Sequence, residues 1–232
     1  MTGPVTIAIP FTDRVDLTAP LVASLLDQRD DWHRLMLIDH GSTDSDTCDW
    51  VTRMHLVDGV EMVALDRIPT ASLYSGWNLA ISHAADDDGI AVILNNDITI
   101  PDRFIADLIN PIRDHPVWWA THIDQQVDHT DSAPTGRITQ TRGLARDGGL
   151  TGWAFAVAAG HWDQPGMRPI DEQLRFYSGD RDLVRLIRRA GGWQGRVDGL
   201  GVTHRSGATR RARPDLLAQQ TADMALCRHI WR

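Results

Sequence analysis

Short apolar runs alternate with segments of helical spacing along the first half of the chain. The apolar residues at 73, 77, 80, 81 and 84 form one helical stripe, and the run at 90–94 has the length of a buried strand. Pro20 suits the first turn of a helix. The pattern predicts strands at 5–10, 35–39, 61–65 and 90–94, and helices at 20–28, 47–54, 73–85 and 104–112. This alternation favours an α/β fold with a Rossmann-like, mostly parallel central sheet flanked by helices.

The second half of the chain has a weaker pattern. A strand is expected at 117–123, and the apolar segment 150–159 returns to the core. Helices are expected at 181–190 and at 214–230. The polar segment 124–149 is predicted to be a long loop, and a loop of this length inside a domain is usually functional or mobile. No repeat or linker is evident, so we expect a single domain over 1–232, in which 211–232 is a C-terminal helical tail.

Composition excludes several classes of protein. A net charge of −8 argues against a nucleic-acid partner, which would need a basic face. All 23 basic residues are Arg, so a Schiff-base lysine and a Walker-type phosphate lysine are excluded. Two cysteines are too few for a disulfide framework. The apolar runs are too short to span a membrane and no signal peptide precedes residue 5, so a cytoplasmic location without a transmembrane segment is expected.

The run Ala91-Val92-Ile93-Leu94 stops on Asn95-Asn96-Asp97. Open α/β sheets bind ligands at the carboxyl ends of their strands. In extended backbone Asn95 and Asp97 point the same way, and they would present two hard oxygens suited to Mg²⁺ or Mn²⁺. The alternative is a polar turn that leaves a strand.

Polar residues also stand at other expected strand and helix ends, and together they resemble a known family. The chain is similar over about 5–210 to GT-A glycosyltransferases of the family-2 type, in the rhamnosyltransferase-like group. The matching segments are IAIPF at 7–11, LIDHGSTD at 37–44, GWNLAI at 76–81, LNND at 94–97, IDE at 170–172 and YSGDRDL at 177–183.

The resemblance implies a donor site for a UDP-, GDP- or dTDP-sugar in residues 1–100, and a site for an acceptor hydroxyl in 101–210. The acceptor would be a glycan, a lipid or a protein. The nucleotide-sugar-binding residues implied are Pro10, Phe11, Thr12, Asp39, Asn78, Asn95, Asn96, Gly152 and Trp153. Three of them have other interpretations, since Asp39 would also cap the turn after it, Asn78 would be an ordinary helix residue and Trp153 would pack in the core. Asp44 is expected to cap a turn or helix.

The same resemblance implies a metal site and a catalytic base. Asp97 would bind Mn²⁺ or Mg²⁺ directly and His204 would complete the site, while Asn95 replaces the first Asp of the family's Asp-x-Asp motif. Asp180 would deprotonate the acceptor, with inversion at the sugar carbon, and Asp182 would be structural or bind the acceptor. The alternative for Asp180 and Asp182 is capping of a first helical turn, where carboxylates are favoured without catalysis.

Two further segments would assist the donor. Residues 124–149 would order over it, and the basic cluster of Arg205, Arg210, Arg211 and Arg213 would close over the diphosphate or form a solvated surface. The function expected is therefore metal-dependent sugar transfer. The alternatives are a sugar-phosphate nucleotidyltransferase and a catalytically decayed nucleotide-sugar-binding module.

Overall fold

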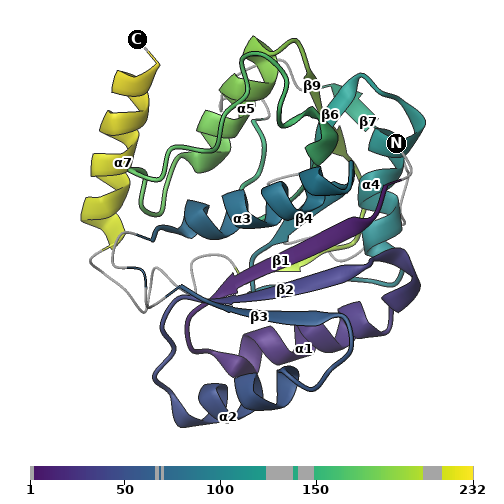
Figure 1. The fold of residues 1–232 in the computed structure, drawn as a ribbon, viewed down its shortest axis with the longest axis vertical. Helices are drawn as coiled ribbons and strands as arrows, with labels where there is room; N and C mark the ends of the chain where they lie inside the picture. Colours follow the sequence, from purple (N-terminus) through teal and green to yellow (C-terminus); the bar gives the residue numbers. More distant parts are fainter. Residues whose placement is uncertain are drawn as a thin grey trace.

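A mixed β-sheet of eight strands forms the centre of the computed structural model, which describes residues 3–65, 68, 71–123, 138–140, 149–205 and 216–231 (Figure 1). In order across the sheet, the strands are β3 (Val60–Ala64), β2 (Arg34–Asp39), β1 (Val5–Phe11), β4 (Ile90–Leu94), β8 (Ala154–Ala158), β6 (Trp118–Ile123), β9 (Trp193–Val197) and β7 (Ile138–Gln140). Two short strands, β5 (Ile98–Thr99) and β10 (Thr203–His204), form a separate antiparallel ladder.

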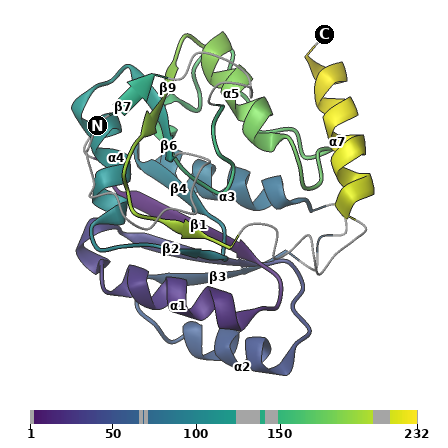
Figure 2. The ribbon, with the colours of Figure 1, turned by 180° about the vertical axis from the view of Figure 1, so that it is seen from behind.

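Helices cover both faces of the sheet, as Figures 1 and 2 show from opposite sides. The helices are α1 (Val15–Leu26), α2 (Ser45–Met54), α3 (Leu73–Asp86), α4 (Phe104–Asp114), α5 (Gly179–Arg189) and α7 (Leu216–Ile230), with short 3-10 turns at Arg29–Asp31 and Ala159–His161. One hydrophobic core contains residues of α1, α2 and α4, and the other contains residues of α3, α5 and α7. Successive residues of β4 alternate between the two cores, because side chains of a strand point to opposite faces in turn.

The mostly parallel sheet predicted from the sequence is confirmed. The pairings of β3, β2, β1 and β4 are all parallel, and so is that of β6 with β9. Strand β8 runs antiparallel to both neighbours, β4 and β6. It therefore starts at the sheet edge where β4 ends, with Ala154 opposite Leu94.

Several elements differ from the prediction. Helix α1 begins at Val15, so Pro20 lies inside the helix and not in its first turn. Its ring nitrogen cannot donate to the carbonyl of Asp16, and the helix runs on without that one hydrogen bond. Strand β7 occupies 138–140, within the predicted loop. Strands β5 and β9 were not predicted.

The remaining predicted elements agree with the structure within a few residues. Asp44 caps α2 as expected, since its carboxylate accepts the backbone N–H of Thr47 at 2.9 Å. Most of the predicted loop at 124–149, the basic residues Arg210, Arg211 and Arg213, and the expected helix start at 214 lie outside the described residues. Within the described ranges, none of the helices has the length and apolar character needed to cross a bilayer.

Asp182 holds α5 in place from within the protein. Its carboxylate receives two hydrogen bonds from the guanidinium of Arg168, both at 2.9 Å, and one from the backbone N–H of Asp171 at 3.0 Å. The indole N–H of Trp231, just past α7, donates a further bond at 2.6 Å. A buried carboxylate with this many donors is fully satisfied, which favours the structural interpretation of Asp182.

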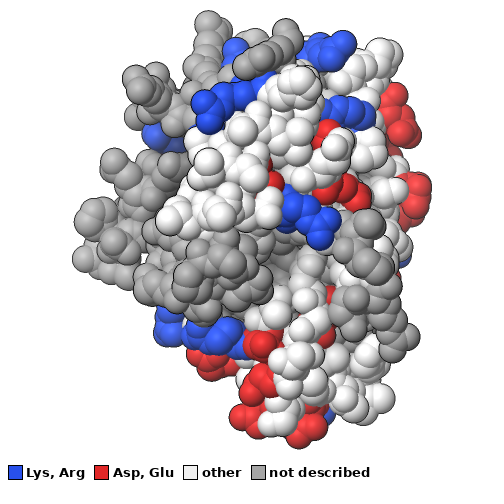
Figure 3. Space-filling view, turned by 90° about the vertical axis from the view of Figure 1, so that its left-hand side faces the viewer, with Lys and Arg blue, Asp and Glu red and all other residues white. Residues whose placement is uncertain are grey.

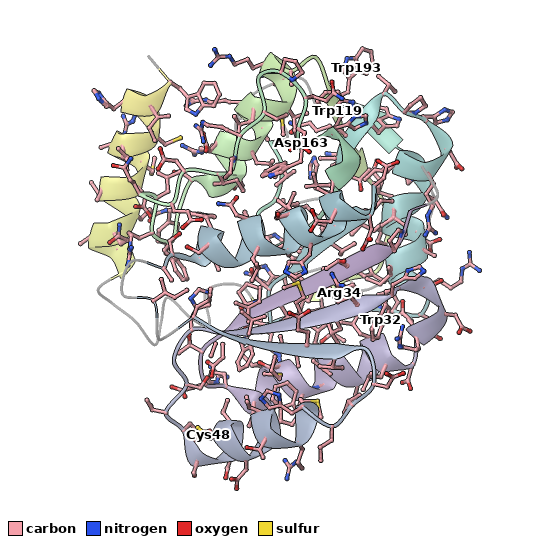
Figure 4. The ribbon with its side chains drawn as sticks, in the orientation of Figure 1. Trp32, Arg34, Cys48, Trp119, Asp163 and Trp193 are labelled. Carbon is pink, nitrogen blue, oxygen red and sulfur yellow. The ribbon has the colours of Figure 1, made fainter. Side chains whose placement is uncertain are left out.

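We predict that Asp182→Asn lowers the free energy of unfolding by about 1.5–3 kcal/mol, since it removes hydrogen bonds made to a buried charge. Urea unfolding followed by circular dichroism measures the change. Asp163→Asn is the matched control, because Asp163 is exposed (labelled in Figure 4). Equal stability of the two variants would show that the Asp182 contacts contribute nothing net.

Candidate functional site

Asp97 and His204 meet beyond the carboxyl end of β4. The ladder of β5 with β10 pairs His204 with Ile98, and the backbone N–H of Arg205 donates to the carbonyl of Asp97 at 2.9 Å. The ladder thereby sets the imidazole Nε2 of His204 3.1 Å from Oδ1 of Asp97. Asp97 is only 6 % exposed, so a carboxylate and an imidazole share a largely buried position.

The carboxylate of Asp97 is poorly satisfied for a buried charge. The 3.1 Å approach of His204 lacks hydrogen-bond geometry, and Oδ1 has no hydrogen-bond partner among the described residues. A buried charged oxygen without a hydrogen bond is costly unless a cation accompanies it, and a neutral imidazole does not supply that charge. The described residues contain no group of three or more His, Cys, Asp or Glu that would hold a metal alone. Asp97 and His204 nevertheless fit a divalent ion that takes its remaining ligands from water and substrate phosphates.

Trp153 packs directly on this pair. Its indole is stacked on the imidazole of His204, with ring centroids 4.3 Å apart and an interplanar angle of 19°. The backbone carbonyl of Trp153 accepts the N–H of Asn95 at 2.8 Å, which ties the start of β8 to the end of β4. Trp153 therefore fixes both the plane of His204 and the backbone before Asp97.

Asp180 lies close to Gly152, the residue that directly precedes Trp153. A Cβ built on Gly152 would lie 3.2 Å from the Cβ of Asp180 and 3.3 Å from the ring of Trp77. The backbone N–H of Arg181 donates to Oδ1 of Asp180 at 2.8 Å. Burial raises the pKa of Asp180 above its ordinary value, and that N–H and the charge of Arg181 oppose the rise only in part. Such a carboxylate has a greater affinity for protons than an exposed one.

The start of α5 allows little freedom for Asp180. Ser178 has a left-handed backbone with φ of 72°, and a Cβ on Gly179 would lie only 2.0 Å from the ring of Tyr74. Burial, and secondarily the charge of Asp180, raise the pKa of Tyr74 well above its ordinary value. Tyr74, Trp77 and Phe155 pack edge to face in a row beneath this segment. The aromatic row supports the start of α5, which carries Asp180.

Asp39 caps the turn that follows β2. Its Oδ1 accepts both the backbone N–H and the hydroxyl of Ser42, at 2.8 and 2.7 Å. Asp13, which the sequence reasoning missed, ties the first loop to this turn, since its carboxylate accepts the N–H groups of Thr43 and Asp44. The capping interpretation of Asp39 is thus observed, and Oδ2 takes no part in this turn.

The other residues expected to border the nucleoside, at the end of β1, differ in their exposure. Pro10 is buried in β1, beyond the last residue that pairs with β4. Phe11 is 3 % exposed and packs edge to face on Trp50 of α2, whereas Thr12 is exposed. His40, which the sequence reasoning also missed, has a buried Nε2 with no hydrogen-bond partner among the described residues, and burial lowers its pKa.

Two asparagines from the predicted donor set bond to the protein itself. Asn78 donates to the carbonyl of Ile170 at 2.9 Å and to Glu172 at 3.0 Å, and accepts the N–H of Ile170 at 2.9 Å. Asn96 donates to the hydroxyl of Thr18 at 3.0 Å. Asn78 thus joins α3 to the segment before α5, and Asn96 joins the loop after β4 to α1.

The side of the molecule that lies at the left of Figure 1 carries mixed charges. Figure 3 shows acidic and basic side chains together on the described part of that side. Arg205 is the one member of the basic cluster that the structure describes, and it lies next to His204.

Comparison with known proteins matches the fold to solved structures. No protein-family model matches the sequence, and a search of curated proteins gave no match. Glucosyl-3-phosphoglycerate synthase from Mycobacterium tuberculosis, solved with Mn²⁺, UDP and glucosyl-3-phosphoglycerate, superposes with a TM-score of 0.64 at 14% identity, over 97% of this chain and 78% of that one.

Two further similar structures are longer than this chain. GalNAc-T7 with UDP, GalNAc and Mn²⁺ gives a TM-score of 0.62 at 14% identity, over 87% of this chain and 44% of that one. Residues 1–349 of TarS from S. aureus give 0.59 at 14% identity, over 84% and 58%. The chain thus spans about half the length of these two solved chains. At such low identity the likeness concerns the architecture, and the chain has the GT-A fold.

We predict that Asp180→Asn raises stability at neutral pH. The folded state raises the pKa of Asp180, so it binds the proton more tightly than the unfolded state, and stability falls as pH rises through the folded pKa. Above the folded-state pKa, Asn removes the free-energy cost of burying the ionised carboxylate. Below the unfolded-state pKa, Asp180 is protonated in both states and the gain in stability disappears. Urea unfolding at several pH values measures it, with Asp163→Asn as the exposed control. A pH-independent difference would contradict the desolvation of Asp180.

Proposed function

We propose that the chain is a metal-dependent glycosyltransferase, which moves a sugar from a nucleotide diphosphate to an acceptor hydroxyl. The observation that carries the proposal is the turn at Gly152 and Trp153. Gly152 lies so close to Asp180 that an added Cβ would be 3.2 Å from the Cβ of Asp180, and the next residue, Trp153, is stacked on His204. The turn therefore brings a candidate base and a candidate metal site into the same region of the fold.

The metal half of the site would be made by Asp97 and His204. These two residues would hold Mn²⁺ or Mg²⁺, which when bound offsets negative charge on the donor diphosphate. Asn95 is neutral where the family's motif has an acid, so this chain offers one carboxylate fewer to the ion. Trp153 keeps the imidazole in one plane, so less order has to be imposed when the ligands close around the ion.

Asp180 would act as the general base. Its carboxylate would accept the proton of the acceptor hydroxyl as that oxygen bonds to the anomeric carbon, while the bond from this carbon to the diphosphate breaks and the nucleoside diphosphate leaves. Attack from the opposite face gives inversion. The burial that raises the pKa of Asp180 strengthens it as a base, provided that the pH keeps it ionised.

The nucleoside would bind near the turn after β2. Oδ2 of Asp39 would accept an N–H of the base, while Oδ1 holds the turn through Ser42. Pro10 and Thr12 would border the nucleoside, and Asn95 would contact the ribose or a metal-bound water. UDP-sugars are the first donors to test, because the solved structures of the M. tuberculosis synthase and GalNAc-T7 contain UDP.

Two variants separate the metal site from the base. We expect Asp97→Ala to abolish transfer and to weaken Mn²⁺-dependent UDP binding, because it removes the one acidic ligand. Asp180→Asn is expected to lower kcat by roughly 100-fold to 10,000-fold with UDP binding unchanged. Donor binding is measured by calorimetry with and without Mn²⁺, and transfer by release of UDP over a panel of hydroxyl acceptors.

Other outcomes would replace the proposal. Pyrophosphate release from a nucleoside triphosphate and a sugar phosphate would identify a nucleotidyltransferase. Donor binding without transfer or hydrolysis would identify a binding module. Full activity of either variant would remove that residue from the mechanism.

A second pair of variants tests Trp153. We predict that Trp153→Ala weakens Mn²⁺-dependent binding of UDP by roughly tenfold, the lower end of the range seen when support of a metal ligand is lost, whereas Trp153→Phe retains it. The measurement is calorimetry with UDP and with the UDP-sugar. A loss of affinity for the UDP-sugar alone would instead mean that the indole stacks on the sugar.

A further inference from the structure

A buried carboxylate on the C-terminal helix holds the loop that leads to Asp180. Asp223 of α7 is 1 % exposed. It accepts the backbone N–H groups of three successive residues, Arg175 at 3.1 Å, Phe176 at 2.8 Å and Tyr177 at 2.7 Å. Gln219, one turn earlier on α7, donates to the same carboxylate at 2.7 Å. Each carboxylate oxygen therefore receives two hydrogen bonds, which uses its full capacity as an acceptor.

Residues 175–178 lead directly into the start of α5, which carries the proposed base Asp180. Tyr177 is followed by Ser178, whose left-handed backbone is unfavourable for a residue with a side chain. Such a conformation persists where the surroundings determine it from several sides. On one side the carbonyl of Arg175 accepts the N–H of Leu73 at 3.1 Å, and Tyr74 packs against Gly179. On the other side, Asp223 accepts the backbone N–H groups of residues 175–177.

Contacts with α5 also hold α7 in place, and these contacts do not involve the backbone of residues 175–177. Arg185 of α5 donates to the carbonyl of Cys227 at 3.1 Å, and Trp231 donates to Asp182 at 2.6 Å. These contacts attach α7 to α5, and Figure 1 shows the two helices on the same side of the sheet. Loss of the Asp223 carboxylate would therefore release the loop while α7 stays attached.

We propose that Asp223 is a positioning residue, which sets the geometry of Asp180 by holding the backbone of residues 175–177. This inference rests on the proposed function of Asp180. Asp223 does not touch the reacting atoms. It determines whether the carboxylate of Asp180 faces the acceptor at the required distance, so it should affect kcat and leave donor binding unchanged.

The test uses the full chain with Asp223→Asn. An amide keeps the shape but points an N–H₂ group at backbone donors, so part of the loop loses its acceptor. We expect kcat to fall by roughly tenfold to 100-fold, because small displacements of a reacting group have effects of this size. KM for the donor should stay within about twofold, as expected when only the transition state is affected. Hydrogen exchange of the amides of 175–177 should accelerate.

Two other variants complete the test. Among the described residues, Gln219 is the one donor to Asp223 that is not part of the loop, and Gln219→Ala should leave kcat unchanged. Asp223→Glu keeps the carboxylate and should recover part of the lost kcat. If Asp223→Asn does not fold, Asp223→Glu carries the test, with a reduced kcat expected at unchanged donor KM. Unchanged kcat and exchange in the folded variant would overturn the positioning role.

The two proposals fail in different ways. Absence of transfer by the unaltered chain would refute the proposed function. Faster exchange at 175–177 without any effect on transfer by an active enzyme would refute only the role of Asp223.

Discussion

The antiparallel pairing of β8 with β4 is the constraint on which the candidate site depends. Parallel strands begin and end together, so a parallel β8 would start at the far edge of the sheet. The reversed strand starts where β4 ends, with Ala154 opposite Leu94. Gly152 and Trp153 therefore lie beside the polar residues that follow β4. A parallel β8 would carry both of these residues to the opposite edge of the sheet, away from Asp97.

Hydrogen bonding divides the acidic residues into two groups. Asp44, Asp182 and Asp223 accept bonds from helix starts, loops and an arginine, and these bonds hold the fold together. Asp97 keeps a buried oxygen without a hydrogen-bond partner in the described part of the chain, and Asp180 has a pKa raised by burial. The carboxylates of Asp182 and Asp223 receive four hydrogen bonds each and have no acceptor site left for a ligand. Function is therefore best sought at Asp97 and Asp180, where burial is only partly compensated.

Local patterns in the sequence predicted most of the fold, because apolar runs and helical stripes are set by neighbouring residues. Strand β9 was not predicted, because its sequence, Trp-Gln-Gly-Arg-Val, has no clear apolar pattern. It forms a strand through its pairing with β6 and β7. The pairing of Asp97 with His204 could be anticipated only through the family resemblance. The bonds of Asn78 to a segment 92 residues away could not be anticipated at all, because nothing local in the sequence encodes them.

The first turn of α5 shows how two acidic residues of one sequence motif, Asp180 and Asp182, come to differ in their surroundings. Asp180 and Asp182 both stand where the positive end of a helix favours carboxylates, and sequence spacing does not distinguish them. Packing does, because Asp182 is enclosed by Arg168, Asp171 and Trp231, whereas Asp180 lies against Gly152, which has no side chain. Because Gly152 has no side chain, Asp180 can lie close to the turn that carries Trp153. Asp182 has no such position. The difference between the structural carboxylate of Asp182 and the proposed catalytic carboxylate of Asp180 thus comes from the residues that other elements place beside each.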